Sequence, residues 1–345
     1  MTIGIILHPY SERHPAGLGR YIFELTKHMV EADSKNSYII FTKGKKSVDF
    51  KGSNWKLSEC PNGLFWLDRG LSRGPKADVY IFNTPIMPLF FKPKRSIVIA
   101  LDYAYWIQAA KSFREWISKY VLYWYNKISL KRADKIVSIS EATKKDTEKF
   151  FGIPAEKITV SYPGFNDFSK LPEEKINVPE KFFLYVGVLK ERKNLIRIVQ
   201  AFIEFYNLRK DFYLVVVGKT GGAYFEAVKK IVEASDAKNN IIFLGFISDN
   251  GVAYLYKHAA ALVFPSLIEG FGFPIVEAAA CGLPTITSIT TSLAEVGDIC
   301  KSILVDPYNI MAIRDAMLKT VAVATRFFSW DKSAYEMIAV AEKLK

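Results

Sequence analysis

Short apolar runs alternate with helical stretches along most of the chain. In the first half, the runs predicted as strands are Ile3–Leu7, Tyr38–Thr42, Val79–Phe82, Ser96–Ala100, Lys135–Ile139 and Thr159–Tyr162. A polar, glycine-containing loop follows the first run, and a helix is predicted over Leu18–Ala32. These runs are apolar at nearly every position, not at every second one, which is typical of a parallel sheet covered by helices on both faces.

A second series of the same kind begins after a break. Pro163-Gly164 ends the first series, and the polar stretch Asn166–Glu180 is predicted to be a linker. The predicted strands that follow are Phe182–Val186, Tyr213–Val217, Ile241–Phe243, Ala261–Phe264, Thr285–Thr287 and Ser302–Val305. The pattern therefore predicts two doubly wound α/β domains, residues 1–165 and 178–328. Ligands of such sheets bind at the carboxyl ends of the strands, so we expect an active site in a cleft between two facing domains.

Composition agrees with two folded domains. The chain has 345 residues, of which 50% are hydrophobic and 24% charged, enough to bury two sizeable cores. Cys60, Cys281 and Cys300 are few and far apart, which argues against a disulfide framework and suggests a reducing compartment. The N-terminus has no basic segment before its short apolar run, so no signal peptide is predicted.

The charge is unevenly distributed. The net charge is +12, and the first 165 residues carry 26 Lys and Arg against 15 Asp and Glu, whereas the rest carry 21 against 20. This asymmetry indicates an anionic partner for the first half: nucleic acid, an anionic membrane or an acidic substrate.

The densest basic segment runs from Lys111 to Arg132, with six basic groups and one acid. Its aromatic and aliphatic residues recur at helical spacing, so an amphipathic helix is predicted. Two interpretations stay open. The aromatic face could pack on the sheet, or the helix could lie in a membrane interface with its tryptophans at headgroup depth.

The most informative stretch for chemistry is Pro265–Pro284. Gly270 and Gly272 follow a predicted strand and allow a tight turn, and Pro274 suits the first turn of a helix that Gly282 and Pro284 end. The N–H groups at the start of such a helix favour an anion such as a diphosphate. Glu269 and Glu277 flank this turn, and carboxylates beside a phosphate site suit the hydroxyls of a sugar.

This stretch resembles the signature of the retaining glycosyltransferases of family 4, also called group 1, which have the GT-B fold. The similar pattern is S-x-x-E-G-F-G-x-P-x-x-E-A-x-A-C-G-x-P, from Ser266 to Pro284. Further segments resemble the family in order and spacing: Gly17–Tyr21, Val186–Leu195 with its R-K-N-L ending, Val216–Lys219, Thr291–Gly297 and Leu304–Tyr308. Phe328-Ser-Trp330 resembles the start of the last helix, so the resemblance implies that a C-terminal helix, residues 329–345, packs back on the first domain.

The resemblance implies roles for individual residues. Glu277 should bind the ribose of the nucleotide, and Glu269 the hydroxyls of the donor hexose, helped by backbone N–H groups of Gly270, Phe271 and Gly272. Arg192 and Lys193 should neutralise the diphosphate and stabilise the leaving group. Gly17 and Gly19 should close on the diphosphate from the first domain. Phe246 and Ile247 should line the base pocket, and Lys219 is a further phosphate candidate or else a solvated lysine.

The chain departs from many relatives after the strand Ser96–Ala100. They carry His-Asp where this chain has Leu101-Asp102, so a side-chain acid/base role at position 101 is excluded. Asp102 is a candidate for contact with the acceptor or the donor 6-hydroxyl, or else a capping acid. His8 and His14 could touch the acceptor or a phosphate, or be plain loop residues. No Asp-x-Asp motif and no cluster with metal-ligand spacing occurs, so neither a divalent metal nor any other cofactor is predicted.

The predicted function is transfer of a hexose from a nucleotide-diphosphate sugar to a hydroxyl of a glycan or lipid-linked acceptor, with retention and without metal. The R-K-N-L segment resembles mannosyltransferases that use GDP-mannose, and a UDP-glucose-type hexosyltransferase is the alternative. A nucleotide-sugar epimerase and a basic nucleic-acid-binding protein are rivals from other classes, although no nucleic-acid motif is found. A dinucleotide oxidoreductase is disfavoured because Gly17-x-Gly19 is not a complete G-x-G-x-x-G. The expected location is cytoplasmic, peripheral on the inner face of a membrane.

Overall fold

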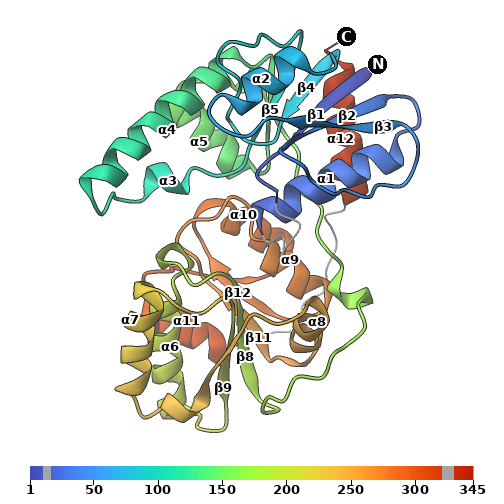
Figure 1. The fold of residues 1–345 in the computed structure, drawn as a ribbon. Coiled ribbons are helices and arrows are strands. Elements are labelled where there is room, and N and C mark those ends of the chain that lie inside the picture. The colour runs from blue at the N-terminus through green and yellow to red at the C-terminus, as the bar shows by residue number, and fades with distance from the viewer. Residues whose placement is uncertain (11–16, 321–329, 345) are drawn as a thin grey trace. The chain divides into compact units, whose positions relative to one another are not determined.

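The chain folds into two units. The computed structural model describes residues 1–10, 17–320 and 330–344. Contacts within the chain group residues 1–164 with 328–345, and residues 165–327 form the second unit. Helix α12 (Trp330–Glu342) packs along α1 (Leu18–Ala32) in the first unit (Figure 1). Residues 328 and 329, where the predicted C-terminal helix was expected to begin, lie outside the described residues.

Within its described residues, the first unit has a sheet of seven parallel strands in the order β3-β2-β1-β4-β5-β6-β7. The strands are β1 (Thr2–Leu7), β2 (Ser37–Lys43), β3 (Trp55–Cys60), β4 (Val79–Phe82), β5 (Ser96–Ala100), β6 (Lys135–Ser138) and β7 (Ile158–Val160). The remaining helices are α2 (Trp66–Arg73), α3 (Ala104–Ile107), α4 (Phe113–Arg132) and α5 (Glu141–Phe151). The order reverses between β1 and β4, and these central strands are buried.

The described part of the second unit has six parallel strands in the order β10-β9-β8-β11-β12-β13. They are β8 (Phe182–Val186), β9 (Tyr213–Val217), β10 (Ile241–Gly245), β11 (Ala261–Phe264), β12 (Thr285–Ser288) and β13 (Ile303–Val305). The helices are α6 (Leu195–Leu208), α7 (Ala223–Glu233), α8 (Asp249–His258), α9 (Phe273–Ala280), α10 (Thr291–Ile299) and α11 (Ile310–Leu318). Here the order reverses between β8 and β11, so the loops after these two strands flank the switch point where doubly wound sheets bind ligands.

The carboxyl edge of the second sheet is lined by three glycines at the ends of neighbouring strands. Gly187 follows β8, Gly218 follows β9 and Gly245 ends β10. The Gly187 N–H donates to Val217 O (2.9 Å), and the Gly218 N–H donates to Gly245 O (2.9 Å). A Cβ at Gly218 would lie 1.9 Å from Gly187 O. Glycine is therefore required where these backbones approach each other.

The fold class predicted from the apolar runs is confirmed, with two differences. Strand β3 was not predicted: among the described strands it pairs only with β2, at the sheet edge, and it carries polar residues such as Lys56 and Glu59, so it lacks a continuous apolar run. The predicted linker 166–180 lies wholly within the second unit, residues 165–327. There Phe168 is buried against Tyr256, with ring centroids 5.4 Å apart.

The helix predicted over residues 111–132 is α4, and its aromatic face does not pack on the sheet. Its buried residues are Asn126, Ser129 and Leu130. The predicted apolar face stays exposed, with Phe113 76%, Trp116 47% and Trp124 55% exposed. The packing interpretation therefore holds only for the opposite face of the helix.

Candidate active site

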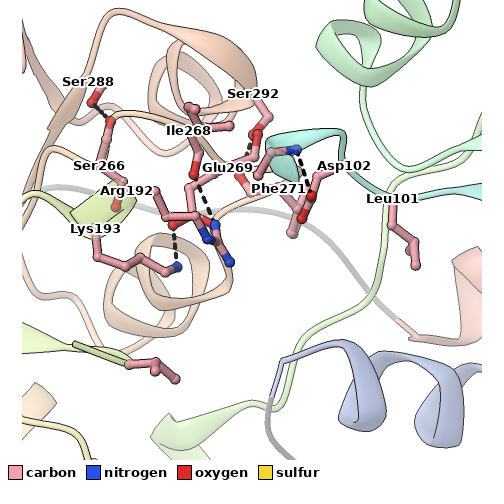
Figure 2. Close-up of polar contacts among 12 residues, drawn as sticks. Leu101, Asp102, Arg192, Lys193, Ser266, Ile268, Glu269, Phe271, Ser288 and Ser292 are labelled. Carbon is pink, nitrogen blue, oxygen red and sulfur yellow. Dashed lines mark hydrogen bonds and ion pairs between the residues drawn. The ribbon is translucent and has the colours of Figure 1, made fainter. Parts of the chain in front are cut away.

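The two loops at the switch point of the second sheet bring together three of the predicted site residues (Figure 2). After β8, a 3₁₀ turn over Glu191–Lys193 carries Arg192 and Lys193. After β11, the loop before α9 carries Glu269. Arg192 Nη1 lies 3.2 Å from Glu269 Oε2, and Lys193 Nζ is bonded to Glu269 Oε1. Two cations therefore flank one carboxylate.

Backbone contacts fix this arrangement. The Leu267 N–H donates to Arg192 O (2.8 Å), and Arg192 Nη1 donates to Ile268 O (3.0 Å). Lys193 Nζ also lies 4.8 Å from the ring centroid of Phe264, at the end of β11. The Glu269 and Lys193 side chains are 8% and 12% exposed, whereas Arg192 is 23% exposed. The charges are thus largely withdrawn from water, which strengthens their mutual attraction.

Asn194 shapes the turn that presents the two cations. Its φ of 64° is left-handed and separates the 3₁₀ turn from α6, a conformation that asparagine tolerates better than most residues. Its Nδ2 donates to Pro265 O (2.9 Å) and Pro307 O (2.7 Å), and its side chain is buried. The sequence motif contained Asn194, but its role was not predicted because both partners are far away in the chain.

The loop Gly270–Gly272 has the turn and helix start that the sequence predicted. Gly272, with φ 110°, precedes α9, and Pro274 lies in the first turn. Ser292 Oγ, in α10, donates to Glu269 O (2.9 Å) and Phe271 O (3.2 Å), which anchors the loop. Ser292 was another residue without a predicted role, since nothing in its local sequence shows this contact.

Glu277 lies in α9 and is largely buried. Tyr256, in α8, donates its hydroxyl to Glu277 Oε2 (3.1 Å). Tyr256 was also missed, because a tyrosine in a helix without a motif carries no sequence signal. Close to Glu269, Tyr185 in β8 is fully buried, and its pKa is raised well above the ordinary range by burial and by the Glu269 carboxylate, so its phenol stays neutral.

The remaining donor-site candidates in the second unit lie at the same sheet edge. Lys219 follows Gly218 at the end of β9 and is exposed; within the described chain its side chain forms no hydrogen bond or ion pair. Phe246 and Ile247 follow β10, and Phe246 is 62% exposed. These positions suit contacts with a ligand, and their roles stay predictions.

The first-unit candidates lie at the carboxyl edge of their own sheet. Gly17, with φ 55°, precedes α1, and Gly19 lies in its first turn. Asp102 follows β5, and its Oδ1 accepts the Ala104 N–H (3.1 Å), as the capping interpretation expects (Figure 2). His8 follows β1, where burial and then Lys43 and Lys46 lower its pKa, so the imidazole is neutral at pH 7. His14 lies outside the described residues.

The described residues contain neither a metal-ligand cluster nor a membrane-spanning helix. In that part of the chain, no three His, Cys, Asp or Glu side chains are grouped as ligands of a metal ion. Over residues 1–10, 17–320 and 330–344, no helix is long and apolar enough to cross a membrane.

Comparison with known proteins finds glycosyltransferases. The model of the family "Glycosyl transferases group 1" matches residues 167–327, and that of "Glycosyltransferase Family 4" matches residues 15–167. An O-antigen chain mannosyltransferase B of Escherichia coli is 30% identical over 203 residues, which cover 56% of this chain and 53% of that protein. The O-antigen chain mannosyltransferase RfbU of Salmonella typhimurium is 34% identical over 166 residues, 47% of this chain and 44% of that protein. The chain therefore spans about half the length of these curated relatives.

Among solved structures, a sucrose-phosphate synthase from Thermosynechococcus elongatus superimposes with a TM-score of 0.73. The match covers 100% of this chain and 99% of that one, at 17% identity. At this identity the likeness concerns the fold: two parallel-sheet α/β domains.

Proposed function

The chain belongs to the group 1 glycosyltransferases of family 4, which have the GT-B fold, and from this premise we propose that it is a retaining mannosyltransferase using GDP-mannose. The substrate classes of the reaction are a nucleotide-diphosphate sugar and a glycan acceptor. The preference for mannose is supported by the O-antigen mannosyltransferases among its relatives. The R-K-N-L segment, which resembles GDP-mannose-dependent enzymes, supports the choice of nucleotide.

One observation carries the proposal: Arg192 and Lys193 flank the Glu269 carboxylate at the switch point of a doubly wound sheet. A diphosphate needs cations, and hexose hydroxyls need a charged acceptor. The loops after β8 and β11 together supply the cations and the carboxylate. When the donor binds, its phosphates take Arg192 and Lys193 as partners, and Glu269 becomes available to the sugar hydroxyls.

In the proposed reaction, the bond between the sugar C1 and the β-phosphate oxygen breaks while a bond from the acceptor oxygen to C1 forms on the same face. Negative charge grows on the leaving phosphate, where Arg192 and Lys193 stabilise it. The acceptor proton passes to a phosphate oxygen. No protein nucleophile is needed, and Leu101 offers no side chain that could act as acid or base.

Glu277 is assigned to the ribose. Its carboxylate accepts a hydrogen bond from Tyr256, and Glu277 lies in α9, the helix that follows the Gly270–Gly272 loop. Glu277→Ala should abolish donor binding while the fold is preserved. Nucleotide-sugar binding measured by thermal shift would be unchanged if Glu277 had no contact with the nucleotide.

The proposed reaction needs no divalent metal, because two side-chain cations take the electrostatic part that a metal plays in other transferases. Activity should persist in EDTA. Complete loss in EDTA with recovery on adding manganese would refute metal independence.

The donor is identified by a thermal-shift panel of GDP-, UDP-, ADP- and dTDP-sugars. A cognate ligand at 100 times its dissociation constant adds about 2.7 kcal/mol to the free energy of unfolding. GDP-mannose is expected to give the largest shift; a larger shift with UDP-glucose would replace the proposed donor by the alternative. The anomeric coupling constant of the product, measured by NMR, then tests retention.

The acceptor is proposed to be a glycan attached to lipid, as in O-antigen or lipopolysaccharide intermediates. The enzyme would then act as a peripheral protein at the inner face of a membrane. The positive charge of the first 165 residues supports this location, since that face carries anionic lipid. No feature of the site favours an epimerase or a nucleic-acid-binding protein.

A further inference from the structure

Helix α4 buries two polar side chains besides Leu130 and leaves a row of large apolar side chains exposed. The buried side includes Asn126 and Ser129, which bond to Tyr105 Oη (2.7 Å) and the Met87 N–H (3.0 Å). The opposite side carries an exposed apolar row, called the α4 stripe, whose members are 40–76% exposed: Phe113, Trp116, Ile117, Tyr120, Val121, Trp124 and Ile128. Most are three or four residues apart and so share one side of the helix. A contiguous apolar face of this kind indicates an interaction surface.

A second apolar protrusion comes from the start of α2 and the loop after β4. It is called the Phe90 knob and consists of Leu64, Phe65, Leu89 and Phe90, which are 75%, 40%, 40% and 76% exposed. The rings of Phe65 and Phe90 touch, with centroids 5.5 Å apart.

The Phe90 knob is built into the fold. The buried carboxylate of Asp68 accepts the N–H groups of Leu89 (3.1 Å), Phe90 (2.6 Å) and Phe91 (2.9 Å). Three backbone donors on one buried acid hold the loop in the conformation that exposes Phe90. The exposure is therefore a property of the folded unit and not of a loose loop.

The knob loop and α4 are joined to each other. Tyr125 Oη donates to Met87 O (2.7 Å), and Arg132 Nη1 donates to Pro88 O (2.8 Å). Both residues lie in α4. Tyr125 directly follows Trp124, and Arg132 lies one turn beyond Ile128. Trp124 and Ile128 belong to the α4 stripe. These two bonds place the loop that carries the knob beside the C-terminal half of α4, so the knob adjoins that end of the stripe.

The charge of this surface indicates which kind of partner it binds. Residues 111–132 hold six basic groups and one acid, and residues 84–95 hold Lys92, Lys94 and Arg95 and no acid. Lys127 Nζ lies 5.0 Å from the ring centroid of Trp124, so a cation borders the apolar stripe. A second copy of the chain would bring like charges together, whereas an anionic bilayer satisfies both the cations and the apolar side chains.

We propose that the α4 stripe and the Phe90 knob together dock the first unit on an anionic phospholipid bilayer. This inference rests on the proposed function, because it supplies the surface that a lipid-linked acceptor requires. The knob also adjoins the carboxyl edge of the first sheet: Phe65 precedes Trp66, whose ring lies edge-on to His8 at the end of β1, 4.9 Å between centroids. A docked enzyme holds this edge close to the headgroups, where the sugar end of a lipid-linked acceptor emerges.

The test is cosedimentation of the full chain with vesicles of phosphatidylcholine alone or mixed with phosphatidylglycerol. Two variants remove two large apolar side chains each: Trp116→Ser with Trp124→Ser, and Leu64→Ser with Phe90→Ser. The matched control, Leu208→Ser with Met311→Ser, removes side chains that are 59% and 45% exposed in the second unit. Each of the first two is expected to weaken binding to the anionic vesicles by about tenfold or more, and the control should bind as the unchanged chain does.

The outcomes separate this inference from the proposed function, because all variants are also tested for donor binding by thermal shift. Loss of vesicle binding in both double variants, with donor binding intact, supports the proposed docking surface. Unchanged vesicle binding of the Leu64/Phe90 pair removes the knob from it and overturns the inference, whatever the donor result. Equal binding to neutral and anionic vesicles refutes the charge argument. Concentration-dependent dimers in sedimentation that the same substitutions abolish would make a second copy the partner instead.

Discussion

The proposed exchange of partners at Glu269 predicts that one substitution has opposite effects on the binding affinities of GDP and GDP-mannose. In the structure, Arg192 and Lys193 are bonded to the Glu269 carboxylate. GDP must compete with this carboxylate for the cations, but it has no sugar to offer in return. Glu269→Gln keeps the shape and removes the charge. GDP should therefore bind more tightly to the variant, whereas GDP-mannose should bind more weakly.

The magnitudes follow from the contacts. A hydrogen bond to a charged group contributes about 1.5–3 kcal/mol, and Glu269 accepts one from each cation. Because the free cations regain some water, we expect about tenfold tighter GDP binding, equivalent to about 1.4 kcal/mol. GDP-mannose loses its charged acceptor for hexose hydroxyls, and the net loss should be about tenfold.

Isothermal titration calorimetry with GDP and GDP-mannose measures both effects. Asp211→Asn is the matched control, because Asp211 is also bonded to two cations in the second unit, Lys181 (2.8 Å) and Arg209 (3.3 Å). That pair is exposed and should affect neither ligand. The reasoning is refuted if a folded Glu269→Gln variant binds GDP no more tightly than the unchanged chain.

Three further predictions concern the scaffold. Asn194→Ala removes two buried hydrogen bonds and the residue suited to φ 64°, so it should destabilise the second unit by about 3–4 kcal/mol; Asn194→Gly, which keeps the backbone freedom, should cost about 1 kcal/mol less in urea unfolding followed by circular dichroism. Gly218→Ala should cost about 3 kcal/mol in the same assay, because its Cβ meets Gly187 O at 1.9 Å. Burial raises the pKa of Asp33, but hydrogen bonds from Tyr38, Asn36 and the Lys35 N–H outweigh it and lower the pKa overall. The stability that this carboxylate adds is present above about pH 4 and is lost as the pH falls through the lowered value, so Asp33→Asn should flatten the acid limb of the unfolding curve followed by tryptophan fluorescence.

The choice of probe in these assays follows from the sequence. All six tryptophans, Trp55, Trp66, Trp106, Trp116, Trp124 and Trp330, belong to the first unit. Tryptophan fluorescence therefore reports unfolding of the first unit, while circular dichroism reports both. A change seen by circular dichroism and not by fluorescence arises in the second unit, which is where Asn194 and Gly218 lie.

The sequence predicted those features of the fold that depend on the local pattern of apolar residues. Central strands such as Val79–Phe82 and Ala261–Phe264 were placed to the residue, because strands buried on both faces leave a continuous apolar run. Strand β3 was not predicted, because it is an edge strand whose exposed Lys56 and Glu59 interrupt the apolar run. The exposed aromatic face of α4 could not be assigned either, since periodicity shows that a face is apolar but not what covers it.

For the site, the sequence predicted the residue types and their shared sheet edge, but not their partners. Lys193 and Glu269 are 76 positions apart, and their contact depends on where the strand order reverses. Asn194 shows the same limit. Its amide reaches carbonyls 71 and 113 residues away, and only the packed sheet brings these within hydrogen-bonding distance.

These long-range bonds fix the position of the two cations within the second unit. Arg192 and Lys193 belong to a turn that is hydrogen-bonded to the loop carrying Glu269: the Arg192 carbonyl accepts the Leu267 N–H, and Asn194, at the end of the turn, donates to Pro265 O. Two like charges held this close would repel each other and lose hydration unless an anion lay between them. Glu269 is that anion in the structure, and in the proposed reaction the diphosphate takes its place. Under the proposed function, the same carboxylate stabilises the turn and, once displaced, accepts the sugar hydroxyls, which would couple recognition of the hexose to recognition of the phosphates.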